Sequence, residues 1–383
     1  MTKKIVSILL IVCMALAFLT ACGGTTTTPP ANTPPADSGT STPAPDAGKD
    51  PAPAPADEKQ FVFKYAFGQP LESTDGKGYQ YLAKVLEEES GGSVKMELYP
   101  ASSLISNNEV LDALMDGTAD MSHATVAYLS PTIKELTPLE IPGMYRGDRY
   151  FDFAAALHQP IDEICNAYGV KIVAVLPACV MNLASTDGIM KSPADMAGKN
   201  IRCAGKWMGE GIGKWGGNGV TITLADVPTA LERKTVDAVY GGCNTVIFPF
   251  KLYELADYVS FTSLQENLGF IAMNLDTWNE MSANQQAAMN RAIAKWAVYT
   301  EQLQLDDVKA FEAALEANGN TVYYLTDEEN QVLIDKSLEL LPQAIEVAGE
   351  KGQQLADICA EIRAGYDVEY QPGVIPEGYN FAD

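Results

Sequence analysis

One arginine of the chain, Arg202, lies inside an apolar, strand-like run at residues 201–204. A guanidinium stays charged and presents its N–H donors in a planar fork, which suits two-point binding of a carboxylate. Arg202 is therefore a candidate anion-binding residue. The alternative, which the sequence leaves open, is a structural ion pair between Arg202 and a neighbouring Asp or Glu.

Patterns for catalysis, cofactors and metals are weak. The two histidines, His123 and His158, stand alone, and no G-x-S-x-G, H-E-x-x-H, P-loop, C-x-x-C or calcium-loop pattern occurs. The G-x-G-x-x-G match at residues 211–216 follows a predicted helix and leads into a predicted strand, the reverse of a dinucleotide site, so we interpret it as a turn. We expect no enzymatic activity, no cofactor and no metal, although a Ser/His/Asp triad stays open.

Strand and helix signals alternate through the body of the chain. A β-rich run at 61–67, apolar residues at helical spacing over 79–89 and a strand at 94–99 predict a βαβ unit. The whole pattern predicts an α/β fold. Further strands are predicted at 170–177, 200–204, 220–224, 236–240 and 270–274, and further helices at 108–115, at 226–232 and after residue 326.

Capping signals mark two helix starts. Ser192 and Pro193 are typical of an N-cap followed by the first turn of a short helix. Ser282 and Gln285 form a capping-box pattern that opens a helix running to about Ala317. Such a helix is roughly 50 Å long at about 1.5 Å per residue, which is enough to brace two lobes.

Ligands of open α/β sheets bind at the carboxyl ends of the strands, so side chains at those ends are candidates for a binding cleft. Trp207 is favoured among the aromatic residues, because it follows Arg202 closely and could cover the apolar body of an acid. The candidates from this argument are Phe67, Gln69, Ser122, His123, Met144, Tyr145, Trp207, Leu224 and Tyr240.

The N-terminal residues indicate export. Lys3 and Lys4 precede an apolar run at 5–19, which is a signal peptide and too short for a spanning helix. The following Leu-Thr-Ala-Cys resembles the lipobox of bacterial lipoproteins, which implies a lipidated Cys22 as the first mature residue; an ordinary secretory signal is the alternative. The Pro-, Thr- and Ala-rich segment up to about residue 57 is typical of an extended spacer.

Composition bounds the function class. The chain has 383 residues, and 26 Lys and Arg against 50 Asp and Glu give a formal charge of −24. Such an anionic surface repels phosphate backbones, so we expect no nucleic-acid partner. The length exceeds what one hydrophobic core organises, about 250–300 residues, and predicts two lobes.

Several blocks of the chain resemble the DctP family, the extracytoplasmic solute-binding proteins of tripartite ATP-independent periplasmic (TRAP) transporters. S-P-A-D-M-A-G-K-N-I-R at 192–202, A-L-E-R-K-T-V-D-A at 230–238 and G-G-S-V-K-M-E-L-Y-P-A at 91–101 are each similar to a family block and occur in the family's order. Residues 109–114 and 117–121 are also family-like, and the resemblance spans about 61–296.

The resemblance implies a periplasmic-binding-protein-like fold, with a long helix bridging two lobes and a ligand cleft between them. It gives Arg202 the role of binding the substrate carboxylate. Asn182 occupies the place of a second arginine that often assists in the family, which leaves a two-arginine clamp in doubt. Ala238 replaces a family glycine, and the polar residue that follows it in the family corresponds to Gly241 or, with a shift, to Asn244.

We therefore expect a receptor that captures a small organic acid and delivers it to TRAP permease subunits, exported and held on the outer face of the cell membrane by its lipid. A binding lipoprotein of an ABC importer and an exported hydrolase are the alternatives. The expected division is a signal peptide at 1–21, lipidated cysteine and linker at 22–58, lobe I at 59–178 with about 265–300, lobe II at about 179–264 with about 301–368, and a tail at 369–383.

Overall fold

The predicted βαβ unit opens the body of the protein. The computed structural model describes residues 58–145 and 150–364. Strands β1 (Phe61–Ala66) and β2 (Val94–Tyr99) pair in parallel, and α2 (Thr74–Glu89) connects them, so this prediction is confirmed. Helix α2 starts earlier than predicted, because the Ser73 side chain accepts a hydrogen bond from the backbone N–H of Gly76.

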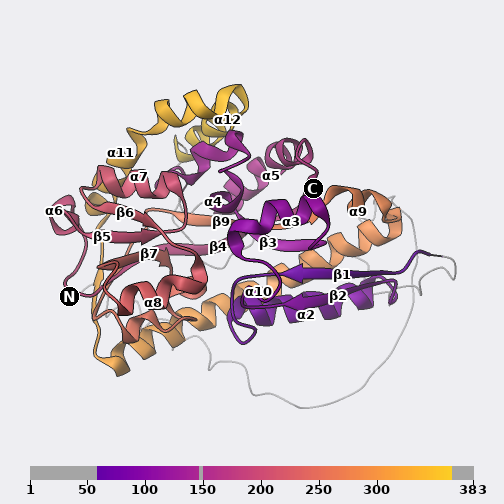
Figure 1. The fold of residues 1–383 in the computed structure, drawn as a ribbon, viewed down its shortest axis with the longest axis horizontal. Coiled ribbons are helices and arrows are strands. Elements are labelled where there is room, and N and C mark those ends of the chain that lie inside the picture. The colour runs from indigo at the N-terminus through magenta and orange to yellow at the C-terminus, as the bar shows by residue number, and fades with distance from the viewer. Residues whose placement is uncertain (1–57, 146–149, 365–383) are drawn as a thin grey trace, which may run out of the picture. The chain divides into compact units, whose positions relative to one another are not determined.

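A ten-stranded sheet runs through both lobes in the order β2-β1-β3-β9-β4-β7-β5-β6, with β8 joined to β4 and β10 joined to β8 (Figure 1). Strand β4 (Val170–Ser185) belongs to both halves. Up to Val180 it pairs with β9, and from Met181 it pairs with β7, which makes it a crossing point between the lobes. The two-lobed α/β class is confirmed. The other strands are β3 (Met121–Thr125), β5 (Asn200–Cys203), β6 (Asn218–Thr221), β7 (Ala238–Gly242), β8 (Tyr258–Phe261), β9 (Glu266–Asn274) and β10 (Thr321–Tyr324).

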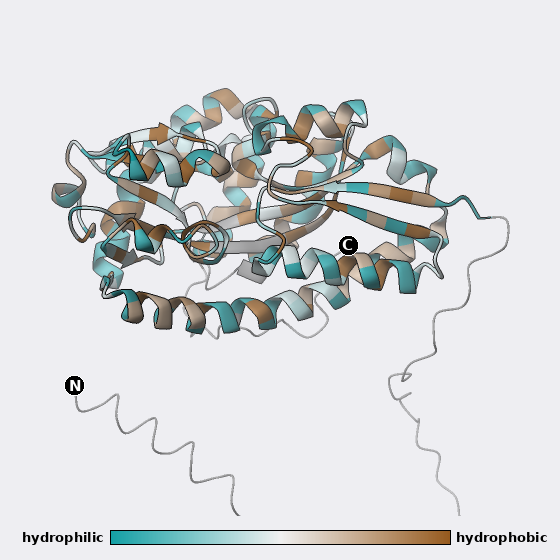
Figure 2. Ribbon diagram, turned by 60° about the horizontal axis from the view of Figure 1, so that its bottom comes forward, coloured by the Kyte–Doolittle hydropathy of each residue, from teal (hydrophilic) through white to brown (hydrophobic). Residues whose placement is uncertain are grey.

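The long helix α10 (Ala283–Asn318) bridges the lobes as expected. It begins at the predicted capping box of Ser282 and Gln285. Its first half contributes residues such as Ile293 to the core under β1, while Phe311 packs in the core of lobe II. Hydrophobic and hydrophilic residues recur along its turns (Figure 2), as a helix that packs on one side requires.

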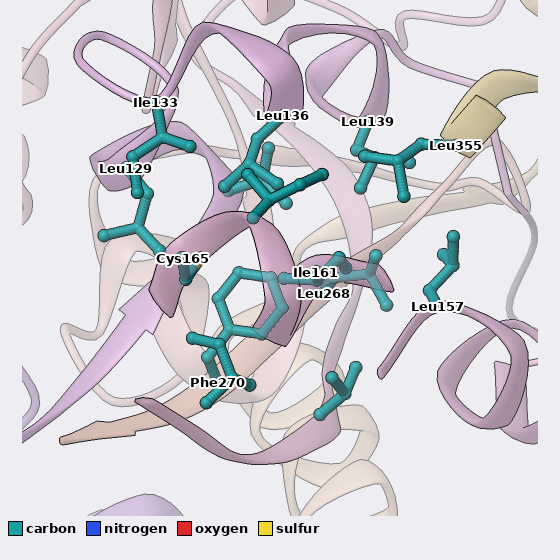
Figure 3. Packing of buried hydrophobic residues seen from close by; sticks show 14 of the residues in the cluster. Leu129, Ile133, Leu136, Leu139, Leu157, Ile161, Cys165, Leu268, Phe270 and Leu355 are labelled. Carbon is teal, nitrogen blue, oxygen red and sulfur yellow. The ribbon is translucent and has the colours of Figure 1, made fainter. Parts of the chain in front are cut away.

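Helix α12 (Leu341–Ala364) corrects the predicted division, which placed residues 301–368 in lobe II. It packs against η2 (Lys134–Glu140) and α5 (Tyr150–Asn166) of lobe I. Figure 3 shows Leu355 of α12 in the same apolar cluster as Leu139 and Leu157. The chain thus returns to lobe I after α11, because α12 has its apolar partners there.

The remaining elements complete the two lobes. Strand β6 ends at Thr221, three residues before the predicted end, and Leu224 begins a 3₁₀ turn instead. The motif at 211–216 lies at the end of helix α7 and in the turn that follows it. The remaining helices and turns are η1 (Asn107–Glu109), α3 (Val110–Asp116), α4 (Val126–Leu129), α6 (Pro193–Met196), α7 (Lys206–Lys214), η4 (Leu224–Asp226), α8 (Val227–Glu232), the π-helical η5 (Cys243–Ile247), η6 (Leu252–Glu254), α9 (Leu275–Glu280) and α11 (Asp327–Leu338).

Some predictions lie outside the described residues. They are the signal peptide at 1–21, Cys22 and nearly all of the linker, and the tail at 369–383. Within the ranges 58–145 and 150–364, no helix has the length and hydrophobicity needed to cross a membrane. The thiols of four cysteines are buried: Cys165, Cys203, Cys243 and Cys359.

Candidate functional site

A pocket lies where side chains of both lobes meet. Its lining surrounds about 410 Å³ of space free of protein atoms, open solvent included. Lobe I contributes residues from the loop after β1, from β3 and from α4, and lobe II contributes residues from β4, β5, β7, η4 and η5. The lining residues are Gln69, His123, Thr125, Tyr128, Met181, Arg202, Ala204, Leu224, Gly241, Gly242, Thr245 and Val246.

Arg202 is the charged group of this lining. It sits on β5 between the parallel neighbours β6 and β7, and its side chain is only 2% exposed. Its Nε and Nη2 atoms donate to the backbone carbonyl of Ile222 at 3.0 and 2.9 Å, which fixes the plane of the guanidinium. Burial lowers the pKa of Arg202 from its ordinary value, since a charged group is disfavoured where water is excluded.

The structural ion pair that the sequence left open is not seen in the described part of the chain. Among those residues no Asp or Glu bonds to Arg202, and the groups that act on its charge are Tyr128 and Cys203. A buried cation without a carboxylate partner is costly. The arrangement therefore suits an anion that enters the pocket.

The facing wall offers neutral polar atoms. The Oε1 atom of Gln69 and the Oγ1 atom of Thr125 are buried and have no hydrogen-bond partner within the described structure. His123, on β3 beside them, is 8% exposed, and burial lowers its pKa to about 4. Its imidazole is therefore neutral near pH 7. This wall can accept from and donate to the hydroxyl or carbonyl groups of a ligand without adding charge.

Four residues predicted for the cleft line this pocket: Gln69, His123, Arg202 and Leu224. Leu224 reaches it from the first position of η4, not from the end of a strand. Gly241, which the family pattern offered as one equivalent of a polar residue, is also in the lining, whereas Asn244 is not.

Two predicted ligand residues have structural partners instead. Trp207 is 4% exposed and belongs to the lobe I core, and its backbone N–H donates to the Glu140 carboxylate. The Asn182 amide accepts from the backbone N–H of Thr262 at 2.9 Å and donates to the carbonyl of Val180. Both side chains lie outside the lining.

The other aromatic candidates also pack in the core. The Tyr240 ring meets Trp215 edge-on at a centroid distance of 5.3 Å. The Tyr145 hydroxyl accepts from the backbone N–H of Leu268 at 3.2 Å. Neither side chain lines the pocket, since each points into a packed interior.

The remaining candidates lie outside the lining. Met144 is fully buried in the core of lobe I. The Ser122 hydroxyl donates to the carbonyl of Ala66 at 2.8 Å, because side chains alternate along β3 and His123 takes the pocket side. Phe67 packs edge-on against Tyr79 at 4.9 Å. Asn244 is buried in η5 beside Thr245, which does line the pocket.

Sequence reasoning missed the lining residues that carry no local signal. Thr125 ends a short strand that was not predicted, and Tyr128 follows it on α4. Thr245 lies in a π-helical segment that no pattern marked. Ala204 could have been found, since it directly follows the strand of Arg202.

No metal centre emerges from the described residues, which contain no group of three or more His, Cys, Asp or Glu placed to hold an ion. The pocket lining also contains no Asp, Glu or Cys side chain. What the described lining offers is one buried cation, neutral hydrogen-bonding groups and apolar contacts. Such a set suits an anion with further polar groups.

Comparisons with known proteins agree with this geometry. Residues 67–346 match the DctP model, described as bacterial extracellular solute-binding protein, family 7. The chain is 24% identical over 286 residues, 70% of its length, to the 2,3-diketo-L-gulonate-binding periplasmic protein YiaO of Escherichia coli, 83% of which is covered. It is 24% identical over 289 residues to the C4-dicarboxylate-binding protein DctB of Bacillus subtilis, covering 72% of this chain and 79% of the relative.

Solved structures share the fold. A TRAP solute-binding protein from Desulfovibrio salexigens with bound orotic acid matches with a TM-score of 0.74 at 19% identity, covering 80% of this chain and 99% of that one. The sugar acid binding protein DctPAm of Advenella mimigardefordensis, in complex with galactonate, gives 0.73 at 17% identity, covering 80% and 100%. The family model spans most of the chain, so the protein belongs to the DctP family, the extracytoplasmic solute-binding proteins of TRAP transporters.

Proposed function

We propose that the pocket binds the carboxylate of a small organic acid through Arg202. The observation that carries this proposal is a guanidinium 2% exposed, oriented by a backbone carbonyl and without a carboxylate partner among the described residues. A ligand carboxylate would supply the missing negative charge. It would accept hydrogen bonds from the Arg202 N–H groups that do not bond to the Ile222 carbonyl. Relatives whose names or titles mention diketogulonate, C4-dicarboxylates, orotic acid and galactonate support an acid as ligand.

The pocket favours an acid whose remaining groups are neutral. The described lining holds one charged side chain, so a second buried carboxylate would lack a partner there. Gln69 and Thr125 suit hydroxyl or carbonyl groups, and Leu224 and Val246 suit a short apolar body.

The bound acid would pass to TRAP permease subunits, with Cys22 holding the receptor at the membrane by its lipid. Both steps follow from the family and from the lipobox-like Leu-Thr-Ala-Cys. The two lobes would close on the acid, since a closed state that contacts it from both walls binds it more tightly. No covalent step is involved.

A thermal-shift screen of the full-length chain tests the ligand class. The panel contains succinate, galactonate, glucuronate and orotate, with neutral sugars as the control set. An acid at about 100 times its dissociation constant stabilises the folded state by about 2.7 kcal/mol, so its melting temperature rises by several degrees. Stabilisation by neutral sugars alone would overturn the carboxylate role.

Two further measurements separate the rival classes. Uptake in cells that persists when ATP is depleted, and stops when the ion gradient is dissipated, supports TRAP subunits over an ABC importer. Mass spectrometry of the acid after incubation distinguishes a receptor, which returns it unchanged, from a hydrolase. If Cys22 carries the lipid, intact-mass analysis of the wild-type protein should show an acylated Cys22 as its first residue; a wild-type chain without lipid on Cys22 would contradict lipid anchoring.

A further inference from the structure

One buried carboxylate lies away from the pocket lining and contacts both lobes. Glu140, the last residue of η2, is 1% exposed. Its Oε1 atom accepts from the backbone N–H groups of Trp207 at 2.7 Å and Met208 at 3.3 Å, and its Oε2 atom accepts from the Ser130 hydroxyl at 2.6 Å. Both carboxylate oxygens are therefore bonded, one to each side of the molecule.

The contact with Trp207 and Met208 caps helix α7 from another part of the chain. The first N–H groups of a helix have no acceptor within it, and the N-cap residue here, Gly205, has no side chain to supply one. A negative charge at this end also interacts favourably with the helix dipole. A β-carbon on Gly205 would lie 2.3 Å from the Glu140 Oε1 atom, so the glycine gives the carboxylate room to reach the helix.

The two ends of this contact belong to the two walls of the pocket. Ser130 directly follows α4, which itself follows β3 with His123 and Thr125. Helix α7 directly follows the turn after β5, which carries Arg202. A shift of α7 away from Glu140 would thus move the cation wall relative to the neutral wall.

We propose that Glu140 is a positioning residue of the pocket. Its carboxylate ties α4 to the N-terminus of α7 and so sets the spacing between Arg202 and the polar atoms that face it. It does not touch the ligand. The assignment of the pocket to an acid rests on the proposed function above, whereas the tie itself does not.

Amide hydrogen exchange of the full-length chain, resolved to single residues, tests the tie without a ligand. In the wild type the amides of Trp207 and Met208 should exchange slowly for first-turn positions of a helix, because each has an acceptor. Glu140→Ala should speed exchange at both amides and also at Ser130, whose own N–H bonds to Val126 across α4. A change confined to Trp207 and Met208 would make Glu140 a local cap only and overturn the proposal.

The second measurement is the affinity for the panel acid that gives the largest thermal shift in the wild type. Glu140→Ala should weaken it by about 10- to 100-fold, since two buried N–H groups and one hydroxyl lose their acceptor and the walls lose their spacing. Glu140→Gln keeps an acceptor for α7 and can donate to the Ser130 hydroxyl. It should restore affinity to within about threefold of wild type and restore slow exchange.

A matched control removes a helix cap elsewhere. Thr326 caps α11 through a capping box with Glu329, so Thr326→Ala should lower the melting temperature while leaving affinity unchanged. Equal affinity of Glu140→Ala and wild type would overturn the positioning role. If no panel acid binds the wild type, the carboxylate proposal fails, and the exchange pattern alone still decides whether Glu140 ties the walls.

Discussion

Replacing Arg202 by methionine separates a ligand-binding arginine from a structural one. Methionine is unbranched and uncharged, and it replaces the apolar stem of the arginine but not its guanidinium. The Ile222 carbonyl would lose the two N–H bonds that it accepts from Arg202. The pocket would lose the charged group of its described lining.

The expected change in stability without ligand is small. Removing the buried charge stabilises the folded state by several kcal/mol. Leaving the Ile222 carbonyl without its hydrogen bonds destabilises it by about 1–3 kcal/mol. The ligand-free melting temperature should therefore stay within a few degrees of wild type or rise. A structural ion pair predicts the opposite, a loss of about 3–5 kcal/mol, which lowers the melting temperature by roughly 6–20 °C.

The expected change in affinity is large. Losing a buried, hydrogen-bonded charge partner costs about 2–5 kcal/mol, which corresponds to about 30-fold to a few thousand-fold weaker binding of the acid. Calorimetric titration and thermal unfolding with and without the acid measure both quantities on one sample. Arg233→Met is the control, because Arg233 is exposed at the end of α8 and should leave both unchanged.

The reasoning requires that Arg202→Met weakens binding of the acid while the ligand-free melting temperature stays within a few degrees of wild type or rises. A variant that binds every acid of the panel as tightly as wild type refutes the carboxylate role of Arg202. A ligand-free melting temperature lowered by about 10 °C, with affinity retained, would show that Arg202 serves the fold instead.

Three further outcomes are expected. Gly205→Ala places a β-carbon 2.3 Å from the Glu140 carboxylate and 2.9 Å from the Ala127 side chain, so it should weaken acid binding as Glu140→Ala does; unchanged binding in calorimetry would contradict that. Burial first, and then the charge of Asp307, raise the pKa of Asp75 from 3.8 to about 7. Because the folded-state pKa lies above the unfolded one, stability is lost as pH rises through this interval, and Asp75→Asn should raise the melting temperature more at pH 8 than at pH 5; equal gains at both would count against it. Since Arg202 is buried and salt screens exposed charges beyond about 8 Å at 0.15 M, the affinity for the acid should change little with added NaCl despite the net charge of −24, and a steep salt dependence would be the contrary result.

Local signals predicted the elements that local interactions determine. The capping box of Ser282 marks a helix start that the structure has, because a cap bonds to N–H groups only a few residues away. The Ser192–Pro193 pair also precedes a helix, with Pro193 in its first turn, but the Ser192 hydroxyl donates to the Asp195 carboxylate and bonds to no backbone N–H group among the described residues. Strand β3 was missed, since all five of its residues are buried and the strand shows no alternation of apolar and polar residues. Helix α12 was assigned to the wrong lobe because its apolar face carries no information about which partner it meets.

The residues of the candidate site were also predicted only in part. Arg202 stood out in the sequence because a charged residue inside an apolar strand is unusual at the level of neighbouring residues. Trp207 and Asn182 were also predicted from the sequence around Arg202, but they lie outside the pocket lining. Trp207 bonds to Glu140 and Asn182 bonds to Thr262, both far away along the chain.

The sequence by itself determined the α/β class, the family and the arginine most suited to an acid, since these depend on residue types and short-range order. Only the tertiary structure decided that Gln69, Thr125 and Arg202 share one pocket, and that Glu140 caps a helix 67 residues further on. The physical reason is that pocket walls and buried carboxylates are completed by groups from distant segments. Packing alone brings those groups within hydrogen-bonding distance.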